Sequence, residues 1–157
     1  MQHVELRPVE DGDLDAFFAH QRDPEAQHQV AFHSRDPEDR AAFDAHWARI
    51  RSDSSIHLRT ILADEECVGY VMSFERDGEA EVGYWLGRAS WGRGLATRAL
   101  QLFLDLQARR PLSARVAADH SASLRVLHKC GFEELRRERN YAPRRGCEIE
   151  EVVLELG

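Results

Sequence analysis

The sequence lacks any long apolar run. No stretch approaches the roughly 20 residues that a helix needs to cross a bilayer. The opening residues 1–5 also contain no basic region followed by an apolar segment, which is the pattern of a secretory signal. We therefore expect a cytoplasmic protein with no membrane partner.

Cysteine is scarce, with 3 among 157 residues, and the three are far apart and form no C-x-x-C pair. We expect reduced thiols with structural roles. The 8 histidines show neither an H-E-x-x-H pattern nor another metal-ligand spacing. No metal site is expected.

Positive charge is in deficit, with 21 Lys and Arg against 28 Asp and Glu and a net charge of -7. This balance would repel a phosphate backbone, so nucleic acid is not an expected partner. The apolar share of 43% and the charged share of 31% are those of an ordinary globular protein. The length suits one domain, residues 1–157, without internal repeats or linkers.

Local patterning predicts a mixture of helices and strands. Helices are expected around Leu14 to Phe18, after Asp36-Pro37, and over residues 95–109 and 121–129. Strands are expected near residues 4–8, 56–63, 68–74, 79–86, 114–118, 132–139 and 148–156. This order indicates an α+β fold, with a mixed, mostly antiparallel sheet and helices on its faces.

The most informative segment is a glycine-rich connection, in which Gly92 and Gly94 stand between a predicted strand and a predicted helix. Glycine lets backbone N–H groups at a helix start approach a phosphate, and the helix dipole favours negative charge there. A P-loop needs Gly-Lys-Ser/Thr and a dinucleotide fingerprint needs a third glycine, and residues 95–97 supply neither. A tight turn without a ligand is the structural alternative.

Three segments together resemble the GNAT N-acetyltransferases. The run Trp91-Gly92-Arg93-Gly94-Leu95-Ala96 is similar to the acetyl-CoA signature Q/R-x-x-G-x-G/A, except that Trp91 replaces the first polar residue. Residues 4–8 and the run Ser-x-Arg-Val-Leu-x-Lys-x-Gly-Phe over residues 123–132 also look like this family. The latter run, with Arg145-Gly146, resembles the subgroup that acetylates amino termini of ribosomal proteins.

The resemblance covers nearly the whole chain and implies a single GNAT-like domain with acetyl-CoA as cosubstrate. It implies that the strand before the signature splays from its neighbour. The implied cofactor contacts are Tyr84, Trp85 and Leu86 for the pantetheine arm, Gly92, Arg93, Gly94, Leu95, Ala96 and Thr97 for the diphosphate, and His120 where the family often has Asn. A solvated Arg93 and a capping or surface His120 are the alternatives.

The resemblance also implies that Glu81 is the general base, because the attacking amine must lose a proton. Strand periodicity places Glu81 on the same face as Trp85, so burial there would raise the pKa of its carboxyl. A solvated strand glutamate is the alternative. A backbone N–H near Leu86 would serve as the oxyanion donor.

The group that protonates the departing thiolate is harder to identify from the sequence. Leu127 stands where many family members have a tyrosine acid, and the serine that serves in the amino-terminal subgroup corresponds to Ser123. Ser123 could instead satisfy N–H groups at a helix start. Tyr141 is a more distant donor candidate. The resemblance also implies an acceptor site beside residues 28–33 and Trp47, although core packing explains Phe32 and Trp47 equally well.

The sequence thus predicts an acetyl-CoA-dependent N-acetyltransferase. The acceptor would be a primary amine, on a protein amino terminus or a small molecule, that attacks the thioester directly without a covalent acetyl-enzyme. A catalytically inactive acyl-CoA-binding module and an interaction domain without cofactor are the alternatives. The oligomeric state is open, and a homodimer is compatible with the sequence.

Overall fold

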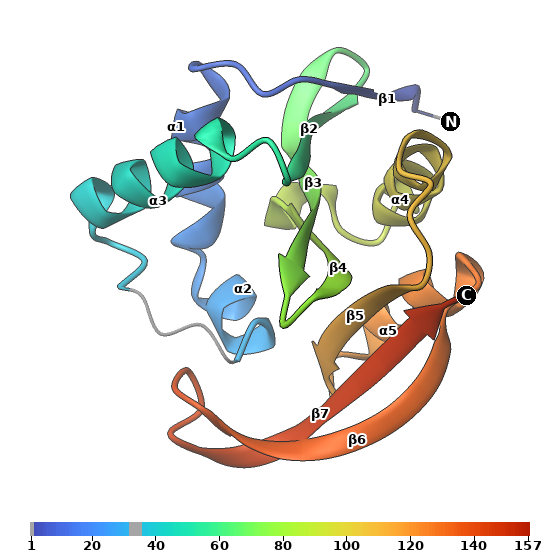
Figure 1. Cartoon of the computed structure of the whole chain (residues 1–157). Coiled ribbons are helices and arrows are strands. Elements are labelled where there is room, and N and C mark those ends of the chain that lie inside the picture. Colours follow the sequence, from blue (N-terminus) through green and yellow to red (C-terminus); the bar gives the residue numbers. More distant parts are fainter. Residues whose placement is uncertain (1, 32–35) are drawn as a thin grey trace.

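Seven strands form one sheet in the computed structural model of the chain, which describes residues 2–31 and 36–157 (Figure 1). The strands are β1 (Val4–Arg7), β2 (His57–Ala63), β3 (Glu66–Arg76), β4 (Glu79–Leu86), β5 (Leu112–Ala117), β6 (Glu133–Ala142) and β7 (Cys147–Leu156). Their spatial order is β1-β2-β3-β4-β5-β7-β6, and every neighbouring pair in the described chain is antiparallel except β4 and β5. The predicted α+β fold is confirmed.

Helices cover both faces of this sheet. They are α1 (Asp13–Gln21), α2 (Pro24–Gln29), α3 (Arg40–Ser52), the 3-10 turn η1 (Arg88–Ser90), α4 (Leu95–Leu106) and α5 (Ser121–Lys129). On one face, Phe103 of α4 and Leu127 of α5 are buried in the same cluster as Val82 of β4. On the other face, Phe17 of α1 and Trp47 of α3 form a smaller apolar cluster.

The two central strands β4 and β5 diverge. They pair only at Ala80 with Leu112 and at Glu81 with Ser113, whereas β5 continues to pair with β7 up to Ala117. Beyond Glu81, the edge of β4 that faces β5 therefore has no strand partner in the described chain. Apart from the carbonyl of Leu86, which accepts a hydrogen bond from the Trp91 indole, the main-chain groups on this edge lack the strand partners that buried backbone groups require, so a ligand can bond them. The structure thus has the splayed strand that the family resemblance implies.

Two helices differ from the sequence-based expectation. Helix α2 was not predicted, because its six residues bury only Ala26 and show no apolar periodicity. Its signal is local: the Asp23 side chain accepts a hydrogen bond from the N–H of Glu25, and Pro24 holds the first helical position. Helix α4 ends at Leu106 rather than at residue 109, since the buried Gln107 donates to Ser73 of β3 at 2.8 Å.

Candidate active site

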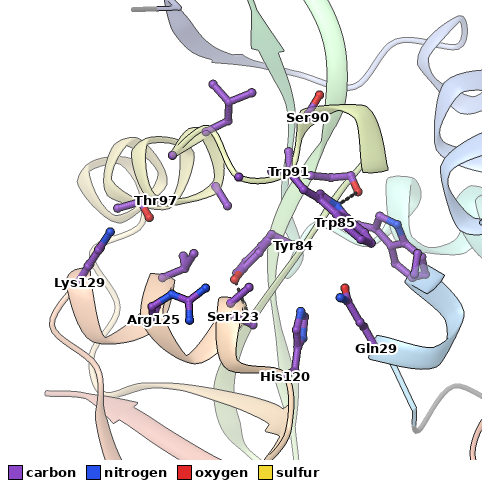
Figure 2. A pocket seen from close by; sticks show the side chains of 18 of the residues that line it. Gln29, Tyr84, Trp85, Ser90, Trp91, Thr97, His120, Ser123, Arg125 and Lys129 are labelled. Atoms are coloured by element: carbon purple, nitrogen blue, oxygen red, sulfur yellow. Dashed lines mark hydrogen bonds between the residues drawn. The ribbon is translucent and has the colours of Figure 1, made fainter.

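A cavity of about 360 Å³ lies at the open edge of β4, bordered by the start of α4, by α5 and by α2 (Figure 2). All the predicted cofactor residues except Arg93 line it: Tyr84, Trp85, Leu86, Gly92, Gly94, Leu95, Ala96, Thr97 and His120. Ser123 lines it as well. Residues from three separate segments, predicted from the sequence, thus meet around one space.

The glycine loop brings backbone N–H groups to this cavity. Gly92 has a φ of +75° and Gly94, the N-cap of α4, has a φ of +74°, which is the left-handed region that glycine adopts without strain. A Cβ added at either glycine would meet no protein atom within 4 Å. The N–H groups in the first turn of the 12-residue helix α4 can therefore be approached by an anion, which the helix dipole favours.

Trp91 connects this loop to the strand that precedes it. Its indole Nε1–H donates to the carbonyl oxygen of Leu86 at 3.0 Å, and the ring lines the cavity (Figure 2). Trp91 thus lacks the polar side chain of the family signature, but its indole holds the loop against the end of β4.

The positive charge at the cavity comes from a helix and not from the loop. The guanidinium of Arg93 donates to Gln2 and to the carbonyl of Ala89, each at 2.7 Å, and Arg93 does not line the cavity. Arg125 and Lys129 of α5 line it instead, with Lys129 beside Thr97 (Figure 2). These two cations were missed in the sequence, although their spacing of four places them on one side of a helix.

Tyr84 and Ser123 form a polar pair inside the cavity. The Tyr84 hydroxyl lies 2.8 Å from Oγ of Ser123, which is 9% exposed. Burial raises the pKa of Tyr84 to about 12, so the phenol stays protonated at neutral pH. Helix α5 begins after its N-cap His120, so Ser123 lies inside the first turn and not at the N-cap, and its hydroxyl is bonded to Tyr84. With Tyr84 as donor, the proton of Ser123 is free to face the cavity.

Glu81 lies deeper, where β4 still pairs with β5. Glu81 is 7% exposed, and its carboxylate forms ion pairs with Arg76 at 3.2 Å and with Arg115 at 3.7 Å. Burial raises the pKa of Glu81, although both arginines oppose this shift. The predicted direction of the shift is therefore confirmed. However, Glu81 is not among the residues that line the cavity, and its role as base stays a prediction.

Residues 3–133 match the acetyltransferase (GNAT) domain family. The chain belongs to this family. A curated relative, an uncharacterized N-acetyltransferase p20 of Bacillus licheniformis, is 31% identical over 93 residues, which are 56% of this chain and 52% of that protein. The chain thus spans about half the length of that relative.

Two solved GNAT structures show how closely the fold is shared. RimJ of Mycobacterium smegmatis, in complex with CoA-disulfide, is 22% identical and has a TM-score of 0.83, with 98% of this chain and 81% of that chain covered. Spermidine N-acetyltransferase of Vibrio cholerae, in complex with CoA and spermine, is 16% identical and has a TM-score of 0.84, with coverages of 98% and 94%. At these identities the likeness concerns the fold.

Part of the segment predicted to lie beside the acceptor, residues 28–33, borders the cavity, although the acceptor position itself stays a prediction. Ala26, Gln29 and Val30 line the cavity, whereas Trp47 stacks on Phe17 in the core, with ring centroids 4.9 Å apart. Phe32 and His33, also expected there, lie outside the described residues.

The remaining candidates lie elsewhere. Tyr141 is 61% exposed and away from the cavity, so nothing in its position supports a donor role. No group of three or more possible metal ligands occurs within residues 2–31 and 36–157. Over the same residues, no helix is long and apolar enough to span a membrane.

Proposed function

We propose that this GNAT protein is an acetyl-CoA-dependent N-acetyltransferase that passes the acetyl group directly to a primary amine. The observation that carries the proposal is the continuity of one cavity, from the glycine loop at the start of α4 to the unpaired edge of β4. Its volume of about 360 Å³ lies in the range of small-molecule sites. The two solved relatives were obtained in complex with CoA-disulfide and with CoA and spermine.

The cosubstrate would be bound by backbone and by helix charges. The N–H groups of residues 92–97 would hold the diphosphate, and Arg125 and Lys129 would offset its negative charge. The open edge of β4 would form hydrogen bonds with the amide groups of the pantetheine arm. This arrangement would place the thioester near Tyr84 and Ser123.

The chemistry would be a direct displacement. The amine nitrogen forms a bond to the acetyl carbonyl carbon, the carbon–sulfur bond breaks, and Ser123 donates a hydrogen bond to the departing sulfur. N–H groups on the unpaired edge of β4 would stabilise the oxyanion. Cys130 is a poor acetyl carrier because burial raises the pKa of its thiol, and only the thiolate is a strong nucleophile.

The charge of the cavity favours one class of acceptor. Among the described residues that line it, Arg125 and Lys129 are cationic and none is Asp or Glu. A polyamine would therefore find no carboxylate among these lining residues for its additional ammonium groups, whereas an acceptor with a single amine, which loses its charge before it attacks, needs none. We propose an α-amine in preference to a polycation.

A thiol-release assay with acetyl-CoA tests the function. The acceptor panel comprises peptides that begin with Ser, Ala or Met, amino acids, polyamines and aminoglycosides. Thiol release with at least one primary amine is expected. A silent panel together with tight CoA binding would favour a catalytically inactive acyl-CoA-binding module. An unchanged melting temperature in millimolar CoA would favour a domain without cofactor.

Ser123→Ala is expected to lower kcat by about 100-fold, the size typical of losing one group that assists proton transfer. CoA affinity should stay nearly constant, since the serine acts at the thioester end. Ser121→Ala, at the exposed start of the same helix, is the matched control. Steady-state kinetics and calorimetric CoA titration measure both effects. Equal kcat values for the two variants would remove Ser123 from the mechanism.

A further inference from the structure

We propose that His120 is the group that takes the proton from the acceptor amine and returns it to the departing sulfur. This inference rests on the proposed function. It assigns the base to a side chain that lines the cavity, whereas the family resemblance points to Glu81, which does not.

The position of His120 suits this task. It caps the start of α5, three residues before Ser123, and both residues line the cavity. Its backbone is fixed, because its N–H donates to Ala117 at 2.9 Å and its carbonyl accepts from Leu124 at 3.2 Å. Figure 2 shows the imidazole between Gln29 of α2 and the pair formed by Tyr84 and Ser123. The ring thus stands between the α2 wall and the group assigned to the sulfur.

The ring is available as a proton acceptor. No hydrogen bond joins its nitrogens to the described residues, and the side chain is half-buried. Burial lowers the pKa of His120, so the imidazole is neutral at pH 7. A neutral imidazole carries the lone pair that a base needs.

The charges around this ring largely compensate one another. Asp119, next in the chain, would raise the pKa of His120, and Arg145 from the β6–β7 connection would lower it. These two residues bond each other at 2.7 and 3.0 Å, which offsets both charges. From α2, His28 lies close enough to favour the ionised form of Asp119, and Arg125 of α5 lines the same cavity. Burial therefore decides the protonation state.

Glu81 is less suited to the same task. Its carboxylate is engaged by Arg76 and Arg115 and lies where β4 and β5 are still paired. An amine in the cavity would reach it only through intervening groups. The two arginines also stabilise its charged form, and this lowers its pKa, in the direction opposite to the effect of burial.

The proton balance closes without another reactant. As the nitrogen attacks the carbonyl carbon, its proton moves to the free ring nitrogen of His120. When the carbon–sulfur bond breaks, the electron pair leaves with sulfur, Ser123 donates a hydrogen bond to it, and the imidazolium delivers the proton to the thiolate. The imidazole is neutral again, and the products are the amide and free CoA.

The test uses the amine that the wild-type protein acetylates fastest in the panel above. His120→Asn should lower kcat by about 100-fold or more. Asparagine is a favoured N-cap residue, so α5 should persist, which circular dichroism checks. CoA affinity should change less than threefold. In His120→Ala, added imidazole should restore part of the turnover, which a purely structural role would not allow.

The pH profile separates the two possible bases. The kcat of the wild-type protein should fall as the pH drops through the lowered pKa of His120, because the imidazolium cannot accept a proton. This acidic limb of the pH profile should have its midpoint at the same pH for two acceptor amines of different basicity, and it should be absent in His120→Asn. Glu81→Gln should retain the limb.

Three results would overturn the assignment. The first is weaker CoA binding of His120→Asn at unchanged kcat, which would make His120 a cofactor contact. The second is loss of the limb in Glu81→Gln and its retention in His120→Asn. The third is an active wild-type protein with an equally active His120→Asn variant. A wild-type protein that is silent on every amine would instead contradict the proposed function, so the two failures are distinguishable.

Discussion

Gly94→Ala is expected to weaken CoA binding by at least about tenfold while the protein stays folded. The φ of Gly94 is +74°, and a non-glycine residue held there costs about 1–3 kcal/mol. A Cβ at this position meets no protein atom within 4 Å, so the fold can accommodate the methyl group. The strain is relieved when the loop rotates, and this rotation turns the N–H groups of residues 95–97 away from the cavity. Calorimetric titration with CoA measures the loss.

Gly78→Ala is the matched control for this variant. Gly78 lies in the turn between β3 and β4, has a φ of +82°, and offers equally open space for a Cβ. It does not line the cavity. The two variants should therefore lose similar amounts of thermal stability, whereas only Gly94→Ala should lose CoA affinity. Equal CoA affinity in both would mean that the main chain of the glycine loop does not bind the diphosphate, and the proposed function would fail with it.

The conformation of the glycine loop could be predicted from the sequence because it is determined locally. Gly92 and Gly94 determine the backbone conformation by themselves, and a helix start lies next to them in the chain. The direction of a long side chain is not local. Arg93 turns away from the cavity because it bonds Gln2, which lies 91 residues earlier. The cations that do line the cavity come from α5, and only the packing of α5 beside α4 brings them there.

The sequence could not decide which residue is the base, because the surroundings of a side chain also depend on distant parts of the chain. Strand alternation gives the face of Glu81 but not its neighbours, and Arg115 reaches it from β5. His120 follows the strand that diverges from β4, so its approach to Ser123 and the α2 wall depends on where the two strands separate. Helix α2 itself has too few buried residues to show a period.

Gly69→Ala is expected to destabilise the fold more than Gly94→Ala does, with a loss of about 3 kcal/mol in the free energy of unfolding. Gly69 lies in β3 beside an irregularity in the pairing with β2, and it faces Leu86 of β4. A Cβ there would lie 2.0 Å from the carbonyl oxygen of Trp85 and 3.0 Å from Cα of Leu86. Both obstacles are backbone, so no side-chain rotation can relieve the overlap.

The overlap can be relieved only by a movement of β4, so Gly69→Ala also tests the site. From Val82 onward, β4 has no partner on its β5 side, so a strand pushed by residue 69 moves into the cavity. CoA affinity should then fall together with stability. Gly83→Ala is the control, because its added Cβ has only Phe74 Cε1 nearby, at 4.0 Å, and its stability should change by less than about 1 kcal/mol. Chemical denaturation and CoA titration follow both variants. If Gly69→Ala were as stable as the parent, β3 would not hold the open edge of β4 rigidly, and the binding of the pantetheine arm would need another support.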